Sequence, residues 1–236
     1  MINIKRLIFV LSFLACFFSV DKINAQKINQ FDKHNNRTGI WRKYYPNKRI
    51  RYEGYFLKGK ELGVFKFYDI STSSFPVIIK SYFKESDSLF VQFFTLKGKL
   101  QSEGLMNGKN REGKWQYYFS DGKILSEENY ENGKLEGDVV NYYPNERVAE
   151  FSTYKNGLRD GVASKYSDKG ILIEEVTFKL GKENGLAKYY ELNGKLKETG
   201  NYKNGKRVGE WEYYLDGEIA SDKIKKENRG TYKKEH

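Results

Sequence analysis

The chain has 236 residues, of which 31% are charged and 39% hydrophobic, and its formal net charge is +11. With a mean hydropathy of -0.76, this composition indicates a soluble body, and no segment beyond the N-terminus is apolar enough to span a bilayer. The basic charge favours acidic partners, namely anionic lipid, acidic polysaccharide or an acidic protein, although lysines also serve simply to keep a surface soluble.

The N-terminus has the layout of a secretory signal peptide. Two basic residues precede an apolar stretch over residues 7–20, and Ala25 ends a candidate cleavage site, so that residues 1–25 are predicted to be removed. The stretch is shorter than the roughly 20 residues that a membrane-spanning helix needs. The apolar run also continues past Cys16, which disfavours lipid attachment there. We expect export to the periplasm, the outer surface or the medium, with no transmembrane segment in the mature chain.

A repeat of 24 or 25 residues covers residues 39–217. The predicted starts of its units are Gly39, Gly63, Ser88, Gly113, Gly137, Gly161, Gly185 and Gly209. Five residues after each start stands an aromatic residue, and this column consists of Tyr44, Tyr68, Phe93, Tyr118, Tyr142, Tyr166, Tyr190 and Tyr214. The position two residues after each start is apolar throughout, from Trp41 to Trp211. Because residues that recur at one position of a repeat are usually structural, we assign both columns mainly to packing between units.

Turn-forming dipeptides fall at two places in each unit, and this favours strands over helices. Asp-Gly or Asn-Gly marks most of these turns, Pro-Asn at 46–47 and 144–145 replaces it, and the turn glycines are Gly108, Gly122, Gly133, Gly157, Gly194 and Gly205. Such dipeptides suit type I′ turns, which need positive φ at both central residues. The sequence therefore predicts an all-β, elongated, single-sheet antiparallel array of about eight β-hairpin units, with strands of about five to seven residues.

The ends of a stacked array need covering, because their edge strands are otherwise unpaired. Residues 26–38 are predicted to form an N-terminal cap. Residues 218–236 carry many lysines and are predicted to form either a charged cap over the last strand or a tail.

Two segments carry a resemblance to a known family: Gly-Lys-Trp-Gln-Tyr-Tyr-Phe at 113–119 and Tyr-Glu-Asn-Gly-Lys-Leu-Glu-Gly at 130–137. The chain resembles the MORN repeat family, in the variant form found in bacterial proteins often labelled YwqK-type antitoxins. The resemblance covers residues 39–217, and residues 63–113 are degenerate. It implies an extended β-hairpin array that serves as a protein-interaction or membrane-associated scaffold. The antitoxin label implies neutralising a partner toxin, but an export signal separates this chain from a toxin inside the cell.

Catalytic chemistry finds little support in the sequence. The only histidines of the predicted mature chain are His34 and His236, which disfavours an imidazole metal site and a catalytic triad. Carboxylates recur at nearly one place in the unit, as Glu53, Glu103, Glu127, Glu150, Glu174 and Glu198. A catalytic pair needs two acids in unlike environments, so we interpret this ladder as pairing with basic residues on adjacent strands. We expect neither enzymatic activity nor a cofactor or metal.

Two features remain as candidate binding sites. Lysines follow several turn glycines and would form an electrostatic track if they lie along one edge; they are Lys109, Lys134, Lys182 and Lys206. The repeat pattern fails between residues 69 and 87, and this segment offers a partner-docking patch around Phe75, Val77 and Ile79 or is a drifted repeat with a bulged loop.

These features favour an exported, non-catalytic scaffold that binds a protein or an anionic envelope component along its sheet. The alternative is an antitoxin-like protein that binds a partner toxin. Interleaved aromatic and basic residues are also typical of single-stranded nucleic-acid platforms, but export disfavours nucleic acid.

Overall fold

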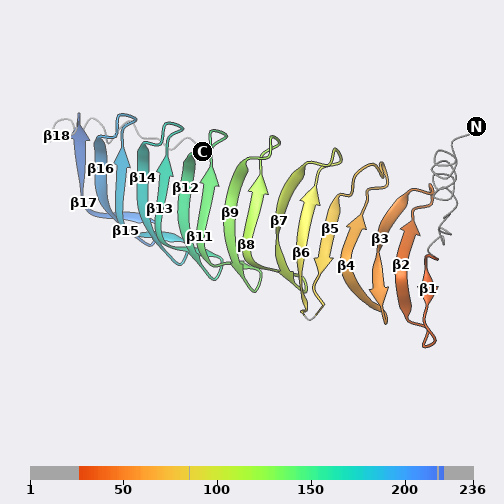
Figure 1. Ribbon diagram of the computed structural model, residues 1–236. Helices are drawn as coiled ribbons and strands as arrows, with labels where there is room; N and C mark the ends of the chain where they lie inside the picture. The colour runs from red at the N-terminus through yellow and green to blue at the C-terminus, as the bar shows by residue number, and fades with distance from the viewer. Residues whose placement is uncertain (1–26, 85, 217, 221–236) are drawn as a thin grey trace, which may run out of the picture.

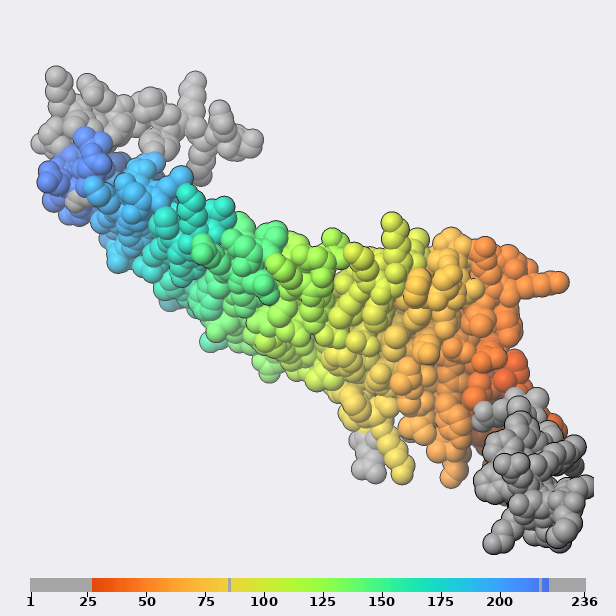
Figure 2. All heavy atoms as spheres, turned by 45° about the horizontal axis from the view of Figure 1, so that its top comes forward, coloured from red at the N-terminus to blue at the C-terminus, as the bar shows by residue number. Residues whose placement is uncertain are grey.

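The computed structural model describes residues 27–84, 86–216 and 218–220, and it forms one antiparallel sheet of 18 strands. Strands that follow one another along the chain pair with one another, so that the sheet is a meander and forms a long, twisted ribbon (Figure 1) and an elongated body (Figure 2). The predicted all-β hairpin array is confirmed. No helix within the described ranges is long and apolar enough to cross a membrane. The predicted signal peptide, and the chain after residue 220, lie outside the described residues.

Most of the longer strands have eight or nine residues, more than the sequence predicted, because each continues through a bulge. The strands are β1 (Gln30–Phe31), β2 (Arg37–Tyr44), β3 (Ile50–Leu57), β4 (Lys60–Phe67), β5 (Ile78–Tyr82), β6 (Ser88–Phe94), β7 (Leu100–Asn107), β8 (Asn110–Tyr118), β9 (Ile124–Glu131), β10 (Lys134–Leu135), β11 (Gly137–Tyr142), β12 (Val148–Lys155), β13 (Leu158–Tyr166), β14 (Leu172–Lys179), β15 (Lys182–Tyr190), β16 (Leu196–Lys203), β17 (Lys206–Leu215) and β18 (Glu218–Ile219).

Two-residue turns join the units at one long edge of the sheet, the lower edge in Figure 1. Both central residues have positive φ, as in type I′ turns, at Lys58-Gly59, Asn132-Gly133, Asn156-Gly157, Leu180-Gly181 and Asn204-Gly205. The turn predicted at Asn107-Gly108 is instead Gly108-Lys109, where only the glycine has positive φ, and Asn107 pairs with Asn110.

The other long edge carries three-residue loops, which corrects the type I′ turns expected there. At residues 120–122, Gly122 N donates to Phe119 O and Phe119 N donates to Lys123 O, which is a type I turn followed by a left-handed residue. The residues after the two Pro-Asn pairs, Lys48 and Glu146, take the left-handed position that glycine holds elsewhere. The aspartate or asparagine of these loops accepts a hydrogen bond from the backbone two residues later, as Asp121 does from Lys123.

A bulge bends the sheet at most units, whereas the pairing of β5 with β6 in the third unit is regular. In β17, Val208 pairs with Asn201 and Glu212 pairs with Thr199, so that the single residue Gly200 of β16 faces three residues of β17. One of these three is Gly209, the glycine at the start of the unit, which has a φ of 67°. Bulges bend the strand that carries them, and Figure 1 shows the strands curving near the lower edge.

The main core is a row of cross-strand neighbours along the inside of this bend, which we call the core row. Its members face one another across neighbouring strands and are Trp41, Gly54, Phe65, Lys80, Val91, Gly104, Trp115, Glu128, Val139, Ser152, Ala163, Val176, Ala187, Gly200 and Trp211. Phe65, Val91 and Ala187 are fully buried, although the described residues form a single sheet.

The bend explains how one sheet buries a core. The hydroxyls of Tyr117 and Tyr130 are 3.5 Å apart, and those of the corresponding Tyr189 and Tyr202 are 3.2 Å apart. The ring centroids of Tyr117 and Tyr130 lie 6.5 and 6.4 Å from that of Trp115. The tyrosines of the bent sheet therefore close over the core row.

In the third unit the structure displaces the predicted repeat register by one residue. Phe94, rather than Phe93, pairs with the first residue of the following strand, Leu100, as the tyrosine does in the other units. Phe93 lies on the other face, with its ring centroid 6.3 Å from that of Trp115. The displacement follows from the longer connection between β4 and β5, so that the third unit begins at Leu89 rather than Ser88.

Neighbouring units are also joined along the loop edge. A side chain of one loop donates to a backbone carbonyl of the next, as in Asn47 Nδ2 to Ile70 O, Lys99 Nζ to Ser120 O, Lys123 Nζ to Pro144 O and Asn145 Nδ2 to Asp168 O, at 2.6 to 3.1 Å. These bonds add to the strand ladder and fix the spacing of the loops.

We predict that Leu180→Asn stabilises the protein. Leu180 has a φ of 50° and is 66% exposed. Its left-handed backbone conformation is strained, and burial of its side chain does not offset that strain. Asparagine tolerates this conformation, and the expected gain in the free energy of unfolding is about 1 kcal/mol by urea denaturation. The reverse substitution in the matching turn, Asn204→Leu, should destabilise by a similar amount. Unchanged urea midpoints for both variants would contradict the argument.

Gly104→Ala should destabilise the protein, because a Cβ at this residue would lie 2.5 Å from the Trp115 ring. Crowding of this kind costs about 1–3 kcal/mol, measurable as a lower midpoint of urea unfolding. Ser152→Ala is the matched control, because Ser152 occupies the same row between the smaller Val139 and Ala163 and already has a Cβ. An equal loss in both variants would show that packing on the ring is not the cause.

Candidate functional site

The two faces of the sheet differ in chemistry. The face inside the bend, which we call the aromatic face, carries the core row and two flanking columns of mostly aromatic residues. One flanking column is Phe56, Tyr82, Met106, Tyr130, Tyr154, Phe178 and Tyr202, and the other includes Phe67, Phe93, Tyr117, Tyr189 and Tyr213. We call the other side of the sheet the opposite face.

Arginines cover the rings of the aromatic face. Arg111 lies 4.6 Å from the Trp115 ring centroid and donates to the hydroxyls of Tyr117 and Tyr130 at 2.6 and 2.9 Å. Arg207 lies 3.9 Å from the Trp211 centroid and donates to Glu198 through both terminal nitrogens. Because cations already occupy these ring faces, the arrangement favours a structural role over ligand stacking.

Burial shifts the titration of the aromatic-face tyrosines. Desolvation raises the pKa of Tyr117, and its hydroxyl contact with Tyr130 raises it further. The pKa of Tyr189 is raised by desolvation and by Tyr202. The pKa of Tyr130 is raised by desolvation and by its bond to Glu128, against opposing effects of Tyr117 and Arg111.

The glutamates predicted as one ladder lie on both faces. Glu53, Glu103 and Glu127 lie on the opposite face, where Glu127 accepts from Gln116 and pairs with Lys114 at 2.7 Å. Burial acts to raise the pKa of Glu127, but the bonds from Lys114 and Gln116 outweigh it and lower that pKa. Glu150, Glu174 and Glu198 lie on the aromatic face and pair with Arg159, Lys165 and Arg207. The difference arises because these three stand one residue earlier in the 24-residue period.

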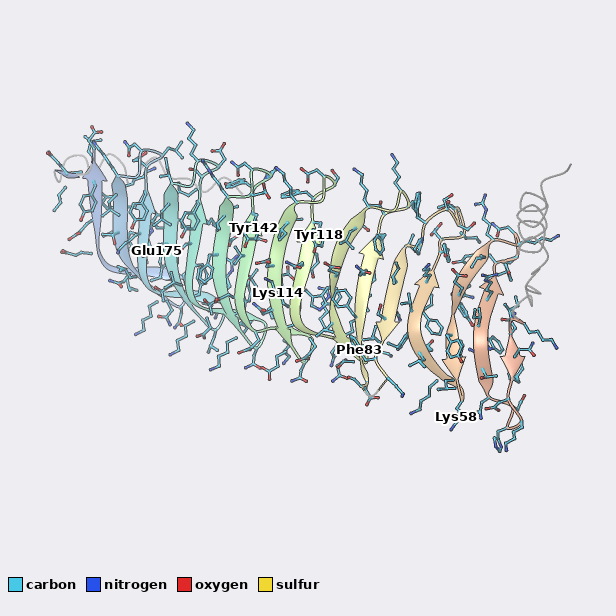
Figure 3. The ribbon with its side chains drawn as sticks, in the orientation of Figure 1. Lys58, Phe83, Lys114, Tyr118, Tyr142 and Glu175 are labelled. Carbon is cyan, nitrogen blue, oxygen red and sulfur yellow. The ribbon has the colours of Figure 1, made fainter. Side chains whose placement is uncertain are left out.

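The predicted tyrosine column joins neighbouring units through hydrogen bonds on the opposite face. The hydroxyls of Tyr68, Tyr118 and Tyr142 donate to glutamates of the preceding unit, Glu53, Glu103 and Glu127, at 3.1, 2.6 and 3.2 Å. Figure 3 shows Tyr118 and Tyr142 on neighbouring units toward the loop edge. These contacts leave the side chains half-buried, so they are structural but do not form the core.

The degenerate segment after β4 does not form a single patch. Phe75 is exposed but its ring lies against Gly98 in the loop between β6 and β7. Val77 and Ile79 are half-buried, and the Val77 backbone bonds to both Phe67 and Phe94. Arg49 holds the same segment by donating to the carbonyls of Ile70 and Ser71. The irregular loop is therefore fixed onto its neighbours.

The predicted lysines fall along the turn edge together with others that the sequence reading missed. Lys134, Lys182 and Lys206 begin β10, β15 and β17, whereas Lys109 lies within a turn. Three further lysines, Lys155, Lys179 and Lys203, end β12, β14 and β16. Together with Lys182 and Lys206 they form what we call the lysine row. All five are exposed on the opposite face.

An exposed apolar patch lies on the opposite face of strands β3 to β7. Its members are Tyr55 at 40% exposure, Leu57 at 44%, Val64 at 52%, Phe83 at 49% and Leu105 at 36%. Half-buried Phe90 connects them, because it pairs with both Ser81 and Leu105. Figure 3 shows that Phe83 lies toward the turn edge, as Lys58 does. The sequence offered no signal for this patch beyond alternate apolar positions in these strands.

A shallow cavity of about 310 Å³ lies between two loops and is lined by Lys99, Leu100, Tyr118, Phe119, Ser120, Asp121 and Gly122. Among residues 27–84, 86–216 and 218–220, no group of three or more histidine, cysteine, aspartate or glutamate side chains is arranged to hold a metal ion.

Comparison with known proteins agrees with the fold. The family model described as MORN repeat variant matches four segments, which are residues 37–58, 111–134, 159–180 and 183–204. Each segment spans one three-residue-loop hairpin, namely β2–β3, β8–β9, β13–β14 and β15–β16. No curated protein matches the chain significantly. The protein is therefore a β-hairpin repeat protein whose first, fourth, sixth and seventh units match the MORN repeat variant model.

The aromatic-face column from Phe56 to Tyr202 escaped the sequence reading. Most of its members recur every 24 residues, as regularly as the tyrosines that were recognised. The arginines at 37, 111, 159 and 207 share the same period. The repeat period alone could have identified both the aromatic column and the arginines, but only the bent sheet shows that they contact each other.

Stability should fall in alkali above about pH 10. Because the fold raises the pKa of Tyr117, Tyr130 and Tyr189, it favours their neutral forms, so their contribution is complete below the ordinary tyrosine pKa of about 10 and is lost as pH rises further. Ultraviolet titration of tyrosinate should show these groups ionising after the exposed tyrosines, alongside a falling urea midpoint. Tyr117→Phe combined with Tyr189→Phe should weaken the pH dependence. A single titration near pH 10 for all tyrosines would contradict this.

Proposed function

We propose that the protein is an exported, non-catalytic repeat scaffold that binds a partner protein through the apolar patch on β3 to β7. The observation that carries the proposal is the patch itself, in which large apolar side chains stay exposed on one face of adjacent strands. Contiguous exposed apolar surface of this kind is typical of protein interaction sites.

The structure around the patch supports a rigid recognition surface. Its strands are paired on both sides, and the core row beneath them holds the fully buried Phe65 and Val91. The patch needs no ordering before it binds, which reduces the entropic cost of association. Lys58, Lys60 and Lys109 lie at the turn edge beside it, so a partner with apolar anchors and an acidic rim would complement the surface.

The export part of the proposal comes from the N-terminal sequence, and the scaffold part comes from the repeat fold. The absence of catalysis remains a prediction from the sequence. It is tested by screening the mature chain against envelope polysaccharides, where saturable hydrolysis abolished by one acidic substitution would overturn it.

Val64→Ser combined with Phe83→Ser should remove most of the affinity for the protein partner. The partner is captured on wild-type protein from the native envelope at high salt, purified, and titrated by calorimetry against each variant. Loss of two anchors of this size predicts about 2 kcal/mol or more, which is roughly 30-fold in Kd. The effect should persist at high salt because the contact is apolar.

The matched control is Leu192→Ser combined with Leu215→Ser, which removes apolar side chains of 71% and 58% exposure outside the patch. These substitutions should leave Kd unchanged. Equal losses for both double variants, or tight binding by the patch variant, would refute the proposed site. Circular dichroism of each variant checks that the sheet is retained.

A further inference from the structure

The lysine row is a second surface, distant in sequence from the apolar patch and independent of it. It runs along the turn edge from β12 to β17, which at about 4.8 Å per strand is a track of about 24 Å. In the described part of the chain, none of its five ammonium groups forms an ion pair or a hydrogen bond.

Like charges face each other at the turn between β14 and β15 and at the turn between β16 and β17. Lys179 pairs directly with Lys182, and Lys203 pairs directly with Lys206. The same place in an earlier unit holds the opposite charges Glu131 and Lys134. Like charges directly across a strand pair are destabilising, and the array shows that other residues fit there. The free protein therefore holds four ammonium groups in a repulsive arrangement that a bound anion would relieve.

Neighbouring residues shape this surface. Two acids on the turn edge, Asp160 and Glu136, already accept hydrogen bonds from the backbone nitrogens of Leu180 and Asn156, at 3.2 and 2.7 Å. Exposed aliphatic side chains flank the row on the same face, namely Leu158, Val162 and Leu186. A ligand of the row therefore meets a line of cations next to apolar side chains.

We infer that the lysine row binds a linear acidic polysaccharide. The row is one residue wide and carries a charge on five of the six strands from β12 to β17, with Leu158 at this place on β13, which matches a polymer with repeated anionic groups. The aliphatic side chains suit the C–H faces of sugar rings. This inference does not depend on the protein-binding proposal, because it uses other strands and other residues.

The twist of the sheet distinguishes a polymer from a flat anionic surface. Neighbouring strands rotate by about 20° relative to each other, so the five steps from β12 to β17 turn the row by about 100°. Figure 1 shows this progressive rotation along the ribbon. A flat bilayer meets only part of such a row, whereas a flexible chain follows all of it.

The test compares the mature protein with a variant carrying Lys179→Gln, Lys182→Gln, Lys203→Gln and Lys206→Gln. The probe is a heparin fragment of defined length, titrated by calorimetry at low and moderate salt. The row variant should bind about tenfold or more weakly, and its affinity should depend less on salt, because it releases fewer counterions. The matched control is Lys33→Gln, Lys48→Gln, Lys97→Gln and Lys169→Gln, which removes the same charge from loops elsewhere and should retain most of the affinity.

Three results would overturn the inference. They are absence of heparin binding by the wild type, an equal loss in the row and control variants, and equally tight binding per charge to phosphatidylglycerol vesicles. The Val64→Ser and Phe83→Ser variant should bind heparin as the wild type does. Loss of partner binding with unchanged heparin binding in that variant would show that the two sites are separate. Either proposal can therefore be refuted without refuting the other.

Discussion

The structure depends on the packing of each core-row residue against its neighbours on the two adjacent strands. A single sheet has no second layer to cover its apolar side chains, and a lone hairpin is marginal in water. Here a bulge in most units bends the sheet so that its two arms enclose the row. Where a large ring fills the bend, the preceding strand supplies glycine, as Gly104 does for Trp115 and Gly200 for Trp211. Where the row is narrow, as from Val139 to Ala187, small residues fill it.

This arrangement divides the surfaces by role. On the aromatic face, rings, arginines and glutamates satisfy one another, so the chemistry that looks most suited to ligands is used for stability. On the opposite face, ion pairs and tyrosine–glutamate bonds occupy the centre of the sheet. The parts with unmet interactions lie toward the turn edge: an apolar patch in the N-terminal half and unpaired lysines in the C-terminal half. A repeat protein can place two different binding surfaces in this way because each unit contacts mainly its neighbours.

The repeat also tolerates local irregularity. The connection after β4 is longer than the other loops, yet β5 and β6 recover the register, and Val91 still enters the core row. Side chains and backbone bonds fix the extra residues onto adjacent loops. The irregular segment is therefore an accommodated insertion, and the exposed apolar surface lies on the strands around it.

The sequence by itself determined the all-β class, the antiparallel hairpin array and most unit boundaries, because glycine-containing turns and aromatic residues recur at a fixed period. It did not determine which columns share a face. Glu127 and Glu150 fall on opposite faces because they stand one residue apart in the unit and successive side chains of a strand alternate between faces. The sequence also did not predict the three-residue loops, the one-residue displacement around Phe93 or the contact between Tyr117 and Tyr130. Only the tertiary structure shows them. Those features depend on how the backbone bends between paired strands, and alternation along a strand carries no record of that bend.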